Sequence, residues 1–240
     1  MDCSVMPTMD RSQGYVTVTC ATAPWTSRAL HDASSVHVVP PILMEIVIAS
    51  CLRSLADLIA MAKKEPGKLS YASAGPGTSQ HLSMELFKLK AGLDIVHIPY
   101  KGSGPAMADL LGGHVKLMMD STAAALNHIR DGRIKAFAVT TARPAPPPLD
   151  NIPPIARTLP GFDAAGWSGL AAPAKTPPEI VARISADMQK LLNDPEIVKQ
   201  IEARAALAAP GGPAEFSAFI KKEIDTWGEV VRATGTKPGT

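Results

Sequence analysis

The chain has 240 residues, 46% of them hydrophobic and 19% charged, proportions typical of one large globular domain or two small ones. The formal net charge is +2, with positive and negative residues interspersed, and only 5% of residues are aromatic. The sequence therefore gives no indication of a nucleic-acid-binding surface. No apolar run approaches the roughly 20 residues that span a bilayer, which argues against an integral membrane protein.

The first 50 residues show little regular pattern. Residues 1–34 have no sustained period apart from Tyr15–Thr19, which alternates like a strand, and 36–39 and 45–49 could form short strands. Asp2 stands where a signal peptide would have basic residues, so the sequence as written predicts no export signal. The three cysteines lack paired spacing and are predicted to be free thiols.

The next segment is a well-signalled helix followed by a repeated unit. Ser54 with Asp57 three residues on predicts a capped helix over 54–64. Three strands, at 69–73, 95–100 and 115–119, then each break into a turn rich in Gly, Ser and Thr before a helical pattern begins. Strands alternating with helices predict an α/β fold with a parallel sheet, whose ligand crevice lies beyond the carboxyl ends of the strands.

The C-terminal half continues the α/β pattern and then becomes helical. A fourth strand is expected at 133–140, an irregular proline-rich connection at 142–165 and a further strand at 167–172. Helices are expected to open at Pro177, Pro195 and Pro213, and their apolar faces need a partner surface.

The three turns favour an anionic ligand. Each helix start leaves N–H groups unpaired and carries partial positive charge, so several starts at one crevice bind an anion without a fixed cation. For any one turn the simpler interpretation is that Thr78, Ser79, Ser103 and Ser121 only cap helices. Three turns in succession favour a carboxylate-binding cleft.

Several catalytic or cofactor interpretations are weaker. Gly75-Pro76-Gly77 lacks the third glycine of a dinucleotide fingerprint, because Gln80 stands in its place, and the sequence contains no phosphate-binding P-loop. Ser73 at a strand end could form a hydrolase triad with Asp120 and His128, but the residue two positions before it is not glycine. We therefore predict neither a cofactor nor a catalytic centre.

Three other polar residues have ordinary structural interpretations beside functional ones. His81 and Glu85 share a helix face but have no third ligand, so no metal site is predicted. His97 alternates with apolar neighbours and is read as a structural histidine. Tyr100 stands at a strand end facing the presumed crevice, where its hydroxyl could meet a ligand or a main-chain partner. Asp120 is expected to cap its helix or to accept a hydrogen bond from a ligand.

The sequence resembles a known receptor family from about Ser54 to the C-terminus. The stretches that carry the likeness are Tyr71–His81, Val96–Pro105, Asp109–Gly113, Ile134–Thr140, Trp167–Leu170 and Pro210–Phe216. In combination they resemble the Bug-type solute receptors of tripartite tricarboxylate transporters.

The resemblance implies a periplasmic binding protein of the type 2 fold, in which two α/β lobes close on a small carboxylate and deliver it to a membrane permease. Such receptors are not enzymes. The carboxylate would be held by turn backbone, small hydroxyl groups and water. The residues that this implies are Ser73, Ala74, Gly75, Gly77, Thr78, Ser79, Tyr100, Gly102 and Asp120.

The sequence also departs from the family. The family's signal peptide and first proline-glycine turn are not found, so we expect an N-terminally truncated receptor with weak or no binding and an uncovered face on the C-terminal helices. The expected parts are an unmatched segment at 1–50, a complete lobe at 68–142, and a partial first lobe from 51–67 and 143–240. An enzyme on the same scaffold and a cytosolic ligand-sensing module stay open as alternatives.

Overall fold

The structure is a computed structural model, and it describes residues 16–18, 42–43, 45–49, 54–167, 169–173 and 175–236. The predicted strands at 36–39 lie outside the described residues, whereas those at 45–49 and within 15–19 are present as β3 (Glu45–Ala49) and β1 (Val16–Val18). The cysteines also lie outside them.

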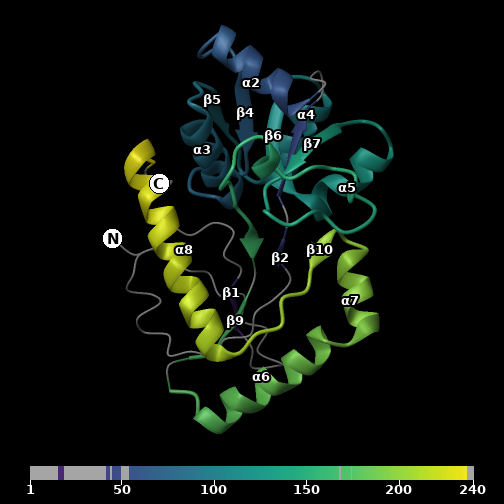
Figure 1. Ribbon diagram of the computed structural model, residues 1–240, viewed down its shortest axis with the longest axis vertical. Helices are drawn as coiled ribbons and strands as arrows, with labels where there is room; N and C mark the ends of the chain where they lie inside the picture. The colour runs from purple at the N-terminus through teal and green to yellow at the C-terminus, as the bar shows by residue number, and fades with distance from the viewer. Residues whose placement is uncertain are drawn as a thin grey trace.

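The upper part of the molecule is a five-stranded sheet in the order β5-β4-β6-β3-β7 (Figure 1). Its other strands are β4 (Ser70–Ser73), β5 (Val96–Pro99), β6 (Leu117–Ser121) and β7 (Lys135–Val139). The strand β4 pairs in parallel with β5 and β6, which confirms the predicted parallel arrangement. The strand β3 is antiparallel to both β6 and β7. Because β6 and β7 both oppose β3, β4 to β7 all end at the same edge of the sheet.

Four helices cover the two faces of this sheet. They are α2 (Leu55–Lys64), α3 (Ser79–Ala91), α4 (Ser103–Leu111) and α5 (Thr122–Arg130). Successive residues of a strand face opposite sides. Tyr71 and Leu117 accordingly join a core with α2 and α3, and Ala72 and Met118 join a second core with α4 and α5.

The lower part contains short strands and the C-terminal helices (Figure 1). A three-stranded antiparallel sheet has the order β10-β2-β8, and β1 pairs antiparallel with β9. These strands are β2 (Ile42–Leu43), β8 (Gly166–Trp167), β9 (Gly169–Ala171) and β10 (Ala206–Leu207). The 3-10 helix η1 (Ile155–Arg157) lies in the proline-rich connection. The helices are α6 (Pro178–Leu192), α7 (Pro195–Glu202) and α8 (Pro213–Thr234).

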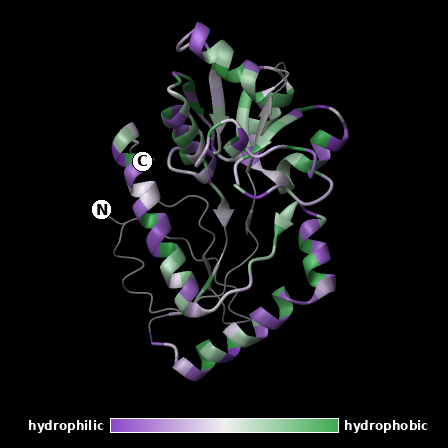
Figure 2. Ribbon diagram, viewed as in Figure 1, coloured by the Kyte–Doolittle hydropathy of each residue, from purple (hydrophilic) through white to green (hydrophobic). Residues whose placement is uncertain are grey.

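The three C-terminal helices are amphipathic, with hydrophilic and hydrophobic stripes alternating along each of them (Figure 2). The expectation of an uncovered apolar face is wrong for α8, where Phe216, Trp227 and Val230 are buried. Trp227 and Val230 reach the core beside α3. Along α6, by contrast, Ile180 and Leu191 are each 47% exposed. The long α8 thus spans from the lower part to the sheet.

Two neighbouring apolar residues of α3 give a test of this core. Phe87 is fully buried and meets the ring of Phe162 edge-on, whereas Leu89 is 51% exposed. We expect Phe87→Ala to lower the free energy of unfolding by about 3–5 kcal/mol, through lost burial and a residual cavity. Leu89→Ala, the control on the same helix, should change it by no more than about 0.5 kcal/mol. Urea unfolding followed by circular dichroism measures both, and equal effects would contradict the assigned faces.

Candidate functional site

Three helix starts meet at the edge where the parallel strands end. The helices α3, α4 and α5 follow β4, β5 and β6, and their N-caps are Thr78, Gly102 and Ser121. The Thr78 and Ser121 side chains accept hydrogen bonds from the third N–H of their helices, so the capping interpretation is confirmed for both. It is wrong for Ser103, which is the first residue of α4 and whose hydroxyl donates to Asp120.

The first two N–H groups of each helix remain available. An α-helix provides no internal acceptor for its first N–H groups, and within the described residues none of these groups bonds elsewhere. The residues that carry them are Ser79, Gln80, Ser103, Gly104, Thr122 and Ala123. Ser79 and Ser103 are half-buried and Gly104 is exposed, so an anion has access to this edge.

The turn before α3 is fixed by its own backbone. Gly75 has φ +134°, and a Cβ atom there would lie 3.2 Å from the Tyr100 carbonyl oxygen, so only glycine fits without strain. The Gly75 N–H donates to Ser73 Oγ at 3.1 Å and the Gly102 N–H to the Ala74 carbonyl at 3.0 Å. These N–H groups hold the turn itself, and the ligand contacts predicted for Gly75, Gly102 and Ala74 stay predictions.

A stack of three rings lies beneath this turn. The ring centroids of Tyr71 and His97 are 4.9 Å apart and those of His97 and His81 are 4.0 Å apart. His97 Nε2 lies 2.6 Å from Ser73 Oγ, and His81 Nδ1 accepts a hydrogen bond from the Gly77 N–H at 3.0 Å. The two imidazoles therefore support both glycines of the turn, Gly75 through Ser73 and Gly77 directly.

Burial keeps this stack uncharged. The pKa of His97 is lowered to about 4, mainly by burial. The neighbouring His81 also lowers this pKa, and its effect is larger than the opposite effect of Glu85. Burial also lowers the pKa of His81. The Tyr71 hydroxyl donates to Glu85 Oε1 at 2.7 Å, and its pKa is raised, first by burial and then by this carboxylate. Glu85 is in turn paired with Lys88 at 2.6 Å, which anchors the stack at its far end.

The Ser73–His97 contact was not predicted, and the alternative triad is not assembled. His97 was read as a structural histidine from its place among apolar neighbours, and the contact depends on the pairing of Tyr71 with His97 across β4 and β5. His128 lies within 3.5 Å of Arg133 and has no contact with Ser73 among the described residues. Ser73 is fully buried, so a hydrolase role for it has no support in this geometry.

Asp120 joins the three helix starts. Its Oδ1 accepts from Gln80 Nε2 and Ser103 Oγ, both at 3.2 Å, and from the Ser121 N–H at 2.8 Å. Its Oδ2 is buried and has no hydrogen-bond partner among the described residues. Burial raises the pKa of Asp120, while its three hydrogen bonds act in the opposite direction. The carboxyl group thus connects the first residues of α3 and α4 with the cap of α5.

Tyr100 lies elsewhere than expected. Its hydroxyl donates to Asp109 Oδ2 of α4 at 2.7 Å, and this bond raises the pKa of Tyr100. The hydroxyl is therefore engaged with α4, and the predicted ligand contact stays a prediction. The Tyr100 backbone contributes to the turn, because its N–H donates to the Ser73 carbonyl and its own carbonyl lies against Gly75.

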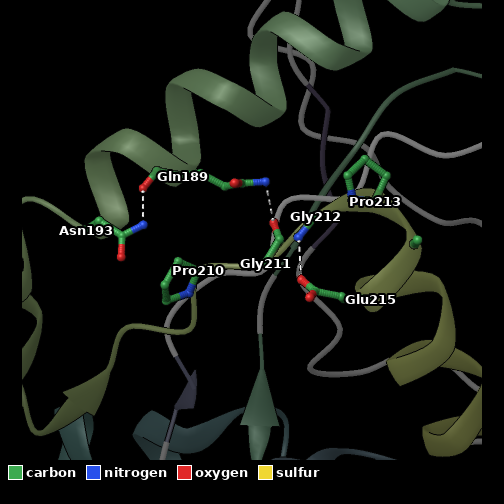
Figure 3. Close-up of a pocket in the computed structure, with 8 residues that line it drawn as sticks. Gln189, Asn193, Pro210, Gly211, Gly212, Pro213 and Glu215 are labelled. Atoms are coloured by element: carbon green, nitrogen blue, oxygen red, sulfur yellow. Dashed lines mark hydrogen bonds between the residues drawn. The ribbon is translucent and has the colours of Figure 1, made fainter.

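A pocket of about 580 Å³ lies away from this edge, between the end of α6 and the start of α8 (Figure 3). Its polar groups already have partners: Gln189 Nε2 donates to the Gly211 carbonyl, and the Gly212 N–H donates to Glu215 Oε2. The Glu215 carboxylate occupies the start of α8 and would repel an anion. We therefore place the candidate site at the sheet edge.

The described residues contain no cluster of three or more His, Cys, Asp or Glu side chains placed to hold a metal. Among the same residues no helix is long and apolar enough to cross a membrane.

A mixed α/β sheet with helices on both faces, a second part of short strands and helices, and helix starts gathered at one sheet edge are features of a periplasmic-binding-protein fold. The likeness to solved structures agrees: Rpa4515 of R. palustris, solved with adipate, matches at a TM-score of 0.76 and 34% identity over 87% of this chain and 70% of its own. MatC of Rhodopseudomonas palustris, solved with bound malate, matches at 0.71 and 26% identity over 83% of this chain and 70% of its own.

Sequence comparison gives the family. A profile described as the tripartite tricarboxylate transporter family receptor matches residues 11–236, so the chain belongs to this family. It is 35% identical over 217 residues to the protein BugT of Bordetella pertussis, covering 88% of this chain and 65% of BugT. It is 35% identical over 193 residues to a protein from the tcbD-tcbE intergenic region of Pseudomonas sp. (strain P51), covering 80% of this chain and 57% of that relative.

The match also bears on the N-terminal segment. We expected residues 1–50 to match no known segment, but the family match begins at residue 11, and β3 at 45–49 forms part of the main sheet. The sequence pattern predicted the strand at 45–49 but not its pairing with β6 and β7, because partners distant in sequence have no local signature. The predicted division into lobes at 68–142 and the flanking segments stays a prediction.

The neutral histidine stack predicts an acid-sensitive fold. Because the pKa of His97 is about 4 in the folded chain against an ordinary value of 6.5, the unfolded chain binds its proton at higher pH. The contribution of His97 to stability is therefore complete above about pH 6.5 and is lost as the pH falls towards about 4. Urea midpoints at about pH 7 and about pH 4.5 should differ less in His97→Gln than in the parent chain. His114→Gln, which replaces an exposed histidine, is the control, and an unchanged difference in His97→Gln would contradict the expectation.

Proposed function

We propose that this chain is a solute-binding receptor that captures a small carboxylate, in the periplasm, for the permease of a tripartite tricarboxylate transporter, and that it is not an enzyme. The observation that carries the proposal is the convergence of free N–H groups at the starts of α3, α4 and α5. Backbone donors at three helix starts suit a carboxylate, since each start adds partial positive charge.

Within the described part of the chain, the site has no internal cation and no exposed reactive group. The Lys101 side chain lies at the rim of the α4 turn and is exposed, where it would attract an anion without fixing it. The Ser73–His97 pair is occupied in supporting the turn, and Ser73 is fully buried. Capture without chemistry is therefore the activity that the geometry supports.

The relatives support a dicarboxylate. Rpa4515 was solved with adipate and MatC with malate, and both ligands carry two carboxylate groups. One carboxylate would lie over the helix starts described above, with its charge delocalised over the free N–H groups of Ser79 and Ser103. The rest of the ligand would extend towards the lower part of the molecule, so that closure of the two parts buries it.

The proposal can be tested at a single N–H group. Ser79 is the first residue of α3, a helix position that accepts proline. The preceding residue, Thr78, has φ −70° and ψ 161°, an extended conformation that is compatible with a following proline. Ser79→Pro thus removes one N–H donor with the helix intact, whereas Ser79→Ala keeps the N–H and removes only the hydroxyl. We expect Ser79→Pro to weaken succinate, malate or adipate binding about 10- to 100-fold, the value of a hydrogen bond to a charged group.

Binding is measured as the rise in thermal unfolding midpoint with millimolar ligand at matched ionic strength, followed by calorimetric titration of each ligand that raises it. Ser79→Ala should bind more tightly than Ser79→Pro. No ligand-specific rise for the parent chain with any carboxylate would contradict the proposed function, and equal binding by the two variants would contradict the role of the α3 start.

A further inference from the structure

Asp120 is an acidic side chain inside a site proposed to bind acids. It contacts the first turns of all three helices whose N–H groups remain free, through Gln80, Ser103 and Ser121. Ser103 is engaged twice, because its hydroxyl donates to Asp120 while its N–H is free for a ligand. A bound carboxylate would therefore lie close to Asp120, and the two acids would compete for the same partial positive charge.

The hydrogen bonds of Asp120 reach only one of its two oxygens. Oδ1 accepts all three, while the buried Oδ2 has none among the described residues. If Asp120 is ionised, a charged oxygen lies buried without a donor, which is costly. A proton on Oδ2 removes that charge and leaves every bond to Oδ1 in place.

The surroundings supply no compensating charge. The sheet strands β4 and β3 and the helices α3, α4 and α5 pack around Asp120. Their described titratable groups are Tyr71, His81, Glu85, Lys88, Lys90, Asp109, His128 and Arg130. None forms an ion pair with Asp120, and the side chain of Glu45, whose backbone pairs beside it, lies outside the described residues.

We infer that Asp120 is a proton-linked positioning residue: binding of a ligand carboxylate at the three helix starts is coupled to uptake of a proton on Oδ2 of Asp120. This inference rests on the proposed function, because it requires an anion at the site. Two carboxylates that share one site do not both ionise freely, so the bound anion stabilises the protonated form of Asp120. Affinity is then greatest in acid and falls as the pH rises through the range in which Asp120 loses its proton.

The test is calorimetric titration of the full chain with succinate at about pH 7.5, in two buffers of different ionisation enthalpy, which counts the protons taken up. Succinate is fully ionised there, so uptake reports on the protein. We expect net uptake by the parent chain, and an affinity that falls by at most about tenfold per pH unit, the limit for one linked proton.

Three variants assign the proton. Asp120→Asn mimics the neutral acid, so it should bind succinate without proton uptake and with a flat pH profile. Asp109→Asn, which removes a carboxylate from α4 outside this cluster, should keep the uptake of the parent chain. Ser103→Ala removes a donor that favours ionised Asp120, so the fall in affinity should move to higher pH. Ser103→Ala and the two-buffer measurement decide the matter if Asp120→Asn does not fold.

The outcomes separate this inference from the proposed function. Succinate binding without proton uptake, or uptake that persists in Asp120→Asn, overturns the linkage and leaves the receptor function standing. An unchanged pH profile in Ser103→Ala overturns it as well. If neither the parent chain nor Asp120→Asn binds any carboxylate at any pH, the proposed function fails and the linkage fails with it.

Discussion

The free N–H groups at the starts of α3, α4 and α5 are the constraint on which the site depends. They lie together because β4, β5 and β6 run parallel and deliver their helices to one edge of the sheet. A helix start cannot satisfy these groups internally, and the N-caps Thr78 and Ser121 satisfy only the third N–H of their helices. The edge therefore needs acceptors from outside, and in the proposed function a ligand carboxylate supplies them.

A second set of polar residues, Asp120 and the ring stack, lies behind this edge and stabilises its geometry. Asp120 connects the three helix starts, and the stack of Tyr71, His97 and His81 supports the turn before α3. The stack and Asp120 differ in how burial affects them, since burial favours neutral histidines but leaves Asp120 with one unpartnered oxygen among the described residues. The rigid, uncharged stack orients the N–H groups, while Asp120 adjusts their electrostatic potential.

Local signals predicted the elements well, and non-local pairing explains what they missed. Ser54 begins α2 as a capping residue, and the proline at each C-terminal helix start marks α6, α7 and α8 correctly. By contrast, three contacts depend on how the strands and helices pack, which residue spacing alone does not determine. They are the pairing of β3 with β6 and β7, the Ser73–His97 contact and the Tyr100–Asp109 hydrogen bond. The meeting of the three turns at one edge of the sheet could be predicted, but the partners of their side chains could not.

The binding edge is also mechanically connected to the lower part of the molecule. The strands β2 and β3 belong to different sheets yet are separated by a single residue of the chain. Beside this connection the Thr122 hydroxyl, at the start of α5, donates at 2.7 Å to the carbonyl of Ala205, a buried non-glycine residue with φ +54°. Such a conformation persists only where its surroundings enforce it. Because the same first turn of α5 offers N–H groups to the proposed ligand, Thr122 links the proposed site directly to the chain segment that leads into β10.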